Sequence, residues 1–228
     1  TTLEGGKAQS LNDKLSQQGF RRSQNIIYRP DCQRCNSCSS VRIPVESYVF
    51  SKSDKRILRK NKEIVRYNCE PWATEEQFEL FSKYLRNRHQ GGGMSEMDSH
   101  EFSSMIEESS VSTTVYEYYY NNKLAAVSLT DTISDGLSMV YSFYDINLSK
   151  NSLGKFMILD HINVVRETGL RNLYLGYLIK ESPKMKYKGL FSPLEQYYKG
   201  KWIPYNEITK SGKSNTYGFG EKNPISLP

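Results

Sequence analysis

Long apolar runs are missing from this sequence of 228 residues: no stretch approaches the about 18 consecutive apolar residues that a membrane-spanning helix needs. A cleavable signal peptide, internal repeats and low-complexity tracts are missing too. Only four cysteines occur, three of them close together, which argues against a secreted disulfide framework. We therefore expect a cytoplasmic protein without a membrane partner. Because the chain opens at Thr1 rather than Met, we expect its natural N-terminus to lie further upstream.

Histidine is also scarce. His89, His100 and His161 stand alone, and none belongs to a Ser/His/Asp or Cys/His constellation of the kind that nucleophilic enzymes use. The remaining composition, with 37% apolar and 12% aromatic residues, is that of a folded protein. The length allows one sizeable core, or a small and a larger domain.

The three clustered cysteines, Cys32, Cys35 and Cys38, are separated by two gaps of two residues within the segment 28–45. Such spacing brings thiols together on a tight turn, as in sites that bind zinc or an iron–sulfur cluster. A fourth ligand is missing nearby, since Cys69 is the only other thiol. A metal or cluster site and three reduced thiols that pack a loop therefore both remain open.

Positive charge is concentrated in two tracts although the chain as a whole carries only +6. The windows 52–66 and 180–222 each carry a net charge of +5, so the rest of the chain is mildly acidic. In the first window the cations recur at helical spacing, which places most of them on one face. This pattern indicates a polyanion partner, nucleic acid being the usual one, and the alternative is a solvated lysine face.

Local patterns predict the elements of the first half. We expect a helix over 11–18 that ends at Gly19, strands over 20–28 and 41–50, a basic helix capped by Ser53, a helix over about 74–90, and a helix opened by Asp98 and Glu101. In the helix over 74–90, Thr74 and Gln77 form a capping-box pattern, and the run Gly91-Gly92-Gly93 ends it.

The second half predicts consecutive strands over 111–120, 124–132 and 137–145, separated by polar turns, which is typical of an antiparallel meander. A helix over 152–168 and a strand over 173–177 come next. This order predicts an α/β (α+β) fold of the acetyltransferase-like type, with a mixed, mainly antiparallel sheet and flanking helices. The turn over 150–155 contains a single glycine, which makes it a weak cradle for the pyrophosphate of coenzyme A.

The strand over 173–177 carries two tyrosines and runs into a loop in which Tyr187 stands between Lys186 and Lys188, with Lys184 nearby. Together they form a set of cationic donors and aromatic faces. This segment strongly resembles the aminoacyl-tRNA–protein transferases, which add an amino acid to the N-terminus of a protein. The resemblance extends along nearly the whole chain, through Gly19-Phe20-Arg21-Arg22-Ser23, Tyr28-Arg29-Pro30 with the three cysteines, Val41 to Val45, Gly92-Gly93-Met94 with Asp98, Phe143-Tyr144-Asp145, Leu153-Gly154 and Pro183 to Gly189.

Around the cysteines the sequence is similar to the bacterial leucyl branch of that family, whereas the arginyl branch shares the C-terminal loop but usually differs there. The resemblance implies transfer of leucine from leucyl-tRNA to proteins with N-terminal Asp or Glu, which creates an N-degron for N-end rule degradation. It implies a monomer and no cofactor for the transfer itself. We expect an N-terminal cysteine-containing region with the basic helix over 1–70 and a transferase domain over 71–228. A further cysteine-bearing segment, usual in the family, has no match here.

The resemblance implies roles for particular residues. Because the ester is already activated, positioning of ester and amine can supply roughly 7 to 11 kcal/mol and no dedicated nucleophile is needed. Candidate catalytic residues are Asp145, Tyr187 and Lys188; candidate substrate-binding residues are Arg42, Lys184 and Tyr177; candidate tRNA contacts are Arg56, Arg59, Lys60 and Arg66; candidate metal ligands are Cys32, Cys35 and Cys38. Lys188 is also a candidate for the carboxylate of an acidic acceptor. Asp145 as a turn cap and the tyrosines as core residues are the structural alternatives.

Two other classes of function stay open. A coenzyme A-dependent N-acetyltransferase would share the order of elements but would need a better pyrophosphate cradle. A noncatalytic RNA-binding module with a zinc knuckle would explain the charge and the cysteines but not the loop of lysines and tyrosines. An arginyl-tRNA–protein transferase remains the alternative within the family.

Overall fold

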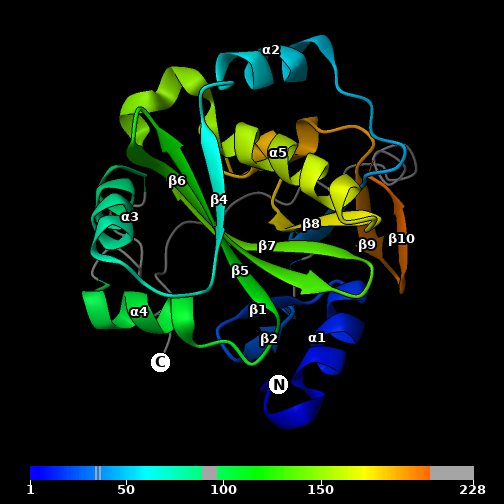
Figure 1. Cartoon of the computed structure of the whole chain (residues 1–228). Helices are drawn as coiled ribbons and strands as arrows, with labels where there is room; N and C mark the ends of the chain where they lie inside the picture. The colour runs from blue at the N-terminus through cyan, green and yellow to red at the C-terminus, as the bar shows by residue number, and fades with distance from the viewer. Residues whose placement is uncertain (34, 36, 89–96, 206–228) are drawn as a thin grey trace, which may run out of the picture.

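The computed structural model describes residues 1–33, 35, 37–88 and 97–205, and its centre is an eight-stranded sheet (Figure 1). The strands are β3 (Ser39–Pro44), β4 (Val65–Cys69), β5 (Thr113–Tyr120), β6 (Lys123–Ile133), β7 (Gly136–Tyr144), β8 (Asn172–Leu178), β9 (Glu195–Tyr198) and β10 (Lys201–Pro204). Their order in the sheet is β10-β9-β3-β8-β7-β6-β5-β4. A separate hairpin consists of β1 (Arg21–Ser23) and β2 (Ile26–Tyr28).

Helices cover both faces of the sheet (Figure 1). They are α1 (Ala8–Gln17), α2 (Lys52–Lys60), α3 (Glu75–Arg88), α4 (Ser99–Glu107) and α5 (Leu153–Glu167), with short 3-10 segments η1 (Gly5–Lys7), η2 (Ile146–Asn151) and η3 (Lys186–Leu190). Side chains alternate along β5: Tyr116 and Tyr118 join the core beneath α5 and α2, while Val115 joins the core beneath α3 and α4. The sheet is therefore a middle layer between two hydrophobic cores.

One pair of strands breaks the antiparallel pattern among the strands described: β7 and β8 run parallel, joined by α5. Their ladder has only three residue pairs, from Gly136 opposite Asn172 to Ser138 opposite Tyr174. A Cβ atom on Gly136 would lie 2.2 Å from the Asn172 carbonyl oxygen, so this close start of the ladder requires glycine. Beyond it, the remaining lengths of β7 and β8 are not paired with each other, which leaves a gap in the middle of the sheet.

Most of the expected elements are confirmed. The meander is β5, β6 and β7, the crossing helix is α5, and the mixed, mainly antiparallel sheet with flanking helices is the expected architecture. Thr74 and Gln77 exchange the two capping hydrogen bonds at the start of α3, and Asp98 and Glu101 do so at α4. The expected break at Gly91-Gly92-Gly93, the motif Gly92-Gly93-Met94, His89 and the end of the second basic tract lie outside the described residues.

Several boundaries were predicted wrongly. Ser51, not Ser53, caps the basic helix, because Asp54 at the third helical position completes a capping box with it. The segment 20–28 is a hairpin rather than one strand, since Gln24 turns the chain with φ of 49°. β3 ends at Pro44, helix α1 begins already at Ala8, and β4, β9 and β10 were not expected.

The expected division of the chain at residue 70 stays a prediction. The strands β3 and β4, which precede that position, belong to the same sheet as the strands that come after it. No helix in the described ranges is both long enough and apolar enough to cross a membrane.

Candidate active site

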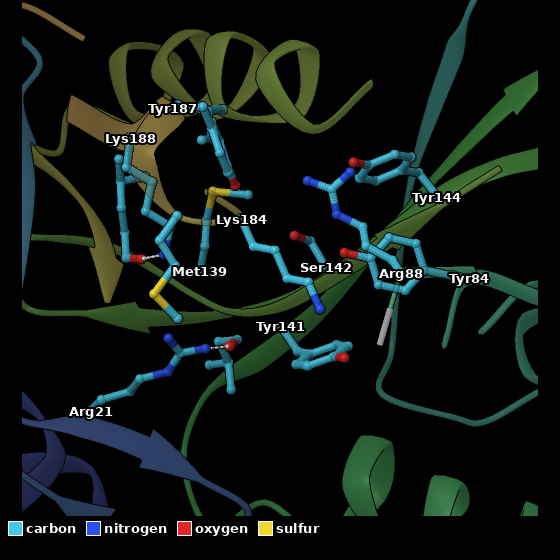
Figure 2. Close-up of a pocket in the computed structure, with 14 residues that line it drawn as sticks. Arg21, Tyr84, Arg88, Met139, Tyr141, Ser142, Tyr144, Lys184, Tyr187 and Lys188 are labelled. Atoms are coloured by element: carbon cyan, nitrogen blue, oxygen red, sulfur yellow. Dashed lines mark hydrogen bonds between the residues drawn. The ribbon is translucent and has the colours of Figure 1, made fainter. Parts of the chain in front are cut away.

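A cavity of about 340 Å³ lies where β7 and β8 separate (Figure 2). Its walls come from β7 and β8, from α3 and α5, from the hairpin, and from the loop after β8. The residues that line it are Arg21, Tyr84, Arg88, Met139, Val140, Tyr141, Ser142, Tyr144, Ile158, Leu175, Lys184, Met185, Tyr187 and Lys188. The cavity thus lies in the gap of the sheet, with access to side chains from both faces.

Two cationic side chains bind backbone carbonyl groups of β7 and β8, where these two strands are no longer paired with each other. The Arg21 guanidinium donates a hydrogen bond to the Val140 carbonyl on β7. The Lys188 amine donates to the carbonyl oxygens of Leu175 and Tyr177 on β8, at 2.7 and 3.1 Å. These bonds satisfy peptide groups that would otherwise be unpaired at the gap. Arg21 and Lys188 therefore stabilise the separation of the two strands, and both lie toward one end of the cavity (Figure 2).

The neighbouring residue Arg22 fixes where Arg21 points. Arg22 is buried and forms two 2.6 Å hydrogen bonds with the Asp131 carboxylate on β6. Because successive side chains of a strand point to opposite sides, anchoring Arg22 to Asp131 of β6 turns Arg21 to the other side of the hairpin strand, where it reaches the Val140 carbonyl of β7. A Cβ atom on Gly176 would lie 2.5 Å from Arg21 Nη1, so the absence of a side chain at Gly176 leaves room for the guanidinium.

The charge that lines the cavity is entirely positive. Arg21, Arg88, Lys184 and Lys188 supply four cations, and no lining residue of the described chain carries a carboxylate. Other arginines of the fold are neutralised within it, as Arg22 is by Asp131. None of the four lining cations forms an ion pair with a carboxylate within the ranges that the structure describes. The cavity is therefore suited to an anionic group.

Burial changes the acid–base properties of the loop residues that line the cavity. Desolvation, helped by the charge of Arg21, lowers the pKa of Lys188 to about 7. Burial raises the pKa of the Tyr187 hydroxyl above its usual range. Near neutral pH, the site therefore combines an amine that is neutral in much of the population with a phenol that keeps its proton.

The opposite end of the cavity is aromatic. The ring of Tyr84 meets that of Tyr144 edge to face, with centroids 5.1 Å apart, and the Arg88 guanidinium carbon lies 5.7 Å from the centre of the Tyr144 ring (Figure 2). Apolar wall comes from Met139, Ile158, Leu175 and Met185. This surface offers contact for an apolar side chain or a stacked base.

Of the expected catalytic and substrate-binding residues, the structure brings Lys184, Tyr187 and Lys188 together in the cavity. Arg42 lies elsewhere: its guanidinium donates to Glu195 at 2.7 Å and packs 4.5 Å from the centre of the Trp202 ring. The Tyr177 hydroxyl donates to the Tyr28 carbonyl at 2.9 Å.

Asp145 lies just after β7 and accepts a hydrogen bond from the Asn147 backbone at 2.9 Å, as a turn cap does. It lines a different, smaller cavity of about 190 Å³. Within the described chain, Arg42, Tyr177 and Asp145 thus make internal contacts outside the main cavity, and their roles in the reaction stay predictions.

The expected tRNA contacts divide into two kinds. Arg56, Arg59 and Lys60 are exposed on α2, which packs against α5 (Figure 1), and Lys60 donates to the Lys150 carbonyl at 2.7 Å. Arg66 on β4 is instead paired with Asp160 at 2.9 Å and Glu167 at 3.4 Å. The surface of α2 can therefore take phosphates directly, whereas Arg66 would have to leave two carboxylates.

The cysteine loop precedes β3. Cys32 and Cys35 are exposed and Cys38 is partly buried, and hydrogen bonds from Ser37 lower the pKa of the Cys35 thiol. Burial and the charges of the two other thiols raise the pKa of Cys38. In the part of the chain that the structure describes, no group of three His, Cys, Asp or Glu side chains is arranged to hold a metal ion. The thiols as placed do not fit a metal site.

Arg21, Arg88 and Tyr141 are site residues that the sequence did not single out. Arg21 was visible only as part of the segment 19–23, where an identical residue stands beside it. Nothing local distinguishes the arginine that is buried against Asp131 from the one that lines the cavity, because the difference depends on how the hairpin packs on the sheet.

Comparisons with known proteins concern the chain as a whole. The family model described as "Arginine-tRNA-protein transferase, C terminus" matches residues 76–198, and the model of the N terminus of the same proteins matches residues 1–56. The aspartate/glutamate leucyltransferase of Ruegeria pomeroyi is 53% identical over 89% of this chain and 75% of its own length. That of Dinoroseobacter shibae is 50% identical over 91% of this chain and 76% of its own.

A solved structure, the GCN5-related glucosamine N-acetyltransferase region of a fungal multi-domain β-N-acetylglucosaminidase, is similar with a TM-score of 0.43 and 8% identity over 86% of this chain and 22% of that one. A likeness this distant assigns no activity. The two family models, and the relatives that are 50% and 53% identical, do assign a family: this chain is an enzyme of the aminoacyl-tRNA–protein transferase family.

Proposed function

We propose that this enzyme transfers leucine from leucyl-tRNA to the α-amino group of proteins that begin with Asp or Glu, and so creates an N-degron for the N-end rule pathway. The relatives named aspartate/glutamate leucyltransferase, at about half identity over most of the chain, support this proposal. The structural observation that carries it is the cavity between β7 and β8, in which four cations that have no ion pair within the described chain adjoin an apolar and aromatic wall.

The cations suit the acidic side chain of the acceptor. A carboxylate that enters the cavity at the Arg21 end can bind this guanidinium without displacing a carboxylate of the protein's own described chain. Charge-assisted hydrogen bonds of this kind are roughly twice as strong as neutral ones. An acceptor whose first residue is neutral does not form these hydrogen bonds, so acceptors that begin with Asp or Glu are preferred.

The same lining favours leucine over arginine as the transferred amino acid. An arginyl side chain in a pocket needs a carboxylate partner, and the lining residues in the described part of the chain offer none. A leucyl side chain needs apolar contact, which Met139, Ile158 and Leu175 provide.

The reaction needs one proton acceptor. The α-amino group of the acceptor has an ordinary pKa of about 7.7 to 8, so part of it is protonated at neutral pH. Only the neutral amine can react. Neutral Lys188 uses its two N–H groups toward Leu175 and Tyr177 and keeps a lone pair for the proton that the amine nitrogen gives up during the reaction. The amine nitrogen then bonds to the ester carbon and the ester C–O bond breaks. The Tyr187 hydroxyl donates a hydrogen bond to the oxyanion, and the tRNA 3′ oxygen leaves with the proton that Lys188 has taken from the nitrogen.

The tRNA backbone is assigned to the exposed cations of α2, namely Arg56, Arg59 and Lys60. Helix α2 packs against α5, and α5 contributes Ile158 to the cavity (Figure 1). Contacts to phosphates give affinity without sequence preference, which suits an enzyme that reads the charged end of a tRNA.

No step of this mechanism passes through the cysteines. A zinc or iron–sulfur centre at Cys32, Cys35 and Cys38 stays a prediction from the sequence, and it would require the loop to rearrange or to receive ligands from outside the described residues. Elemental analysis of the full-length protein, purified without oxygen, tests it.

The deciding experiment offers leucyl-tRNA or arginyl-tRNA, each with a labelled amino acid, together with peptides that begin with Asp, Glu, Arg or Ala. We expect labelled leucine on the Asp and Glu peptides only. Label from arginyl-tRNA on the same peptides would favour the arginyl alternative. Consumption of acetyl-coenzyme A without any aminoacyl transfer would overturn the proposal in favour of an N-acetyltransferase.

A further inference from the structure

A second cavity, of about 600 Å³, adjoins the first. It shares Arg21, Val140 and Tyr141 with the cavity between β7 and β8, and its other walls are the β1–β2 hairpin and helix α4. The two cavities therefore meet at Arg21.

Apart from the shared Arg21, the charged residues without an ion pair that line the described second cavity are acidic, whereas those that line the first are basic. Glu101 of α4 and Glu108, the residue directly after that helix, line the second cavity, and both are exposed. Glu101 accepts a hydrogen bond from the Asp98 backbone and Glu108 one from Gln24, but neither forms an ion pair with a cation of the described chain. Arg22, which also lines this cavity, is neutralised by Asp131.

The two carboxylates disfavour a nucleic-acid occupant, because they repel phosphates. They fit a cation instead. Apolar lining from Met97, Met105 and Leu129, together with the ring of Tyr28, offers contact for the aliphatic stem of a lysine or arginine whose charged end reaches the carboxylates. The first cavity is lined by positive charge and the second by negative charge. This order matches an acceptor peptide whose first residue is acidic and whose next residues are basic.

We propose that the second cavity holds the acceptor's second and third residues and selects for lysine or arginine there. This inference rests on the proposed function, since an acceptor whose first residue occupies the cationic cavity must continue into adjoining space. An extended chain advances about 3.3 Å per residue, so the residues next to the N-terminus are those that reach α4. The enzyme would then distinguish among acidic N-termini by the charge of the second and third residues.

The test compares peptides that begin with Asp and differ only at positions 2 and 3, which are both Lys, both Ala or both Glu. From two partly exposed ion pairs we expect kcat/KM for leucine transfer to be about 3- to 10-fold higher for the Lys peptide than for the Ala peptide, with the Glu peptide lowest. The double variant Glu101→Gln/Glu108→Gln should bring the Lys and Ala peptides to within about 2-fold of each other. Glutamine also completes a capping box, so the start of α4 is preserved.

The matched control is Glu79→Gln, an exposed carboxylate on α3 outside this cavity, which should keep the wild-type order of peptides. Equal kcat/KM for the three peptides, or a preference that survives the double variant, overturns the inference while leaving leucine transfer intact. If no peptide receives leucine, the proposed function fails instead. Binding of the same peptides, labelled at their C-termini and followed by fluorescence anisotropy, then decides the inference: the Lys peptide must bind more tightly, and equal affinities overturn it.

Discussion

The Arg22 guanidinium and the Asp131 carboxylate form a two-point ion pair in the interior, with both hydrogen bonds at 2.6 Å and both residues almost fully buried. The pair joins the β1–β2 hairpin to β6 and so fixes the residue beside it, Arg21, at the junction of the two cavities. The position of the proposed specificity residue therefore depends on an ion pair that does not line the first cavity.

Removing one partner of this pair should destabilise the fold strongly. In Asp131→Ala, Arg22 is left buried without its carboxylate, and the expected loss in the free energy of unfolding is about 3 to 5 kcal/mol. Urea unfolding followed by circular dichroism measures it. The exposed pair of Lys83 and Glu79 provides the control, since Glu79→Ala should cost less than about 1 kcal/mol. A loss of that small size in Asp131→Ala would mean that the hairpin is not anchored by this pair.

Replacing Arg21 should weaken the recognition of acidic acceptors. In Arg21→Gln a charge-assisted hydrogen bond to the acceptor carboxylate is lost, which is worth roughly 1.5 to 3 kcal/mol, or about 10- to 150-fold in kcat/KM for Asp peptides. Peptides that begin with Asn should lose much less, so the ratio of Asp to Asn is the measurement that separates recognition from general damage.

The matched control for Arg21 is Arg29→Gln. Arg29 is exposed and packs over Phe20, outside both cavities, and its replacement should leave the ratio unchanged. An Asp to Asn ratio that stays at the wild-type value in Arg21→Gln would remove Arg21 from acceptor recognition.

The sequence predicted those parts of the fold that have local causes. The caps at Thr74 and Asp98, the meander and the crossing helix depend on patterns within a few residues, and they are confirmed. The insertion of β3 between β8 and β9 has no local cause, because it depends on pairing with strands more than a hundred residues away. The same holds for the site: Lys188 was found from its loop, but the two carbonyl groups that it binds are free only because β7 and β8 separate.

Neutralising the basic surface of α2 should weaken tRNA binding without changing which amino acid is transferred. For Arg56→Gln/Arg59→Gln we expect lower affinity for leucyl-tRNA. The salt dependence should also be weaker: the slope of log affinity against log salt concentration should decrease in magnitude by roughly 0.7 to 0.9 for each lost phosphate contact. Filter binding over a range of salt concentrations measures the slope. In Arg66→Gln the slope should stay unchanged, since Asp160 and Glu167 already pair with that side chain. A fall in slope there would return Arg66 to the tRNA-binding surface.

Lys188 should determine part of the pH dependence of transfer. Two groups must lose a proton before reaction, the acceptor amine near pH 8 and Lys188 near pH 7, so log kcat/KM should rise with a slope of about 2 at low pH. In Lys188→Gln the rate should fall by about 10²- to 10⁴-fold, and the slope should drop to about 1 because only the acceptor titrates. Lys186→Gln, an exposed lysine of the same 3-10 segment, should keep the slope of the wild type. A slope of 2 in Lys188→Gln would exclude Lys188 as the proton acceptor.

The free energy of unfolding should also depend on the protonation of Lys188, without any substrate bound. The pKa of Lys188 is lowered from 10.5 to about 7 in the folded protein, so below pH 7 both states carry the proton and the folded state bears the cost of burying a charge. Between pH 7 and 10.5 only the unfolded state binds that proton, and the free energy of unfolding should therefore rise with pH, by up to about 1.4 kcal/mol per unit. Urea unfolding at pH 7 and pH 9 should show the wild type gaining up to about 3 kcal/mol relative to Lys188→Met, whereas Lys186→Met should behave as the wild type does. Parallel behaviour of wild type and Lys188→Met would show that the amine is solvated and ionised in the fold, and the assignment of Lys188 as a neutral base would then be wrong.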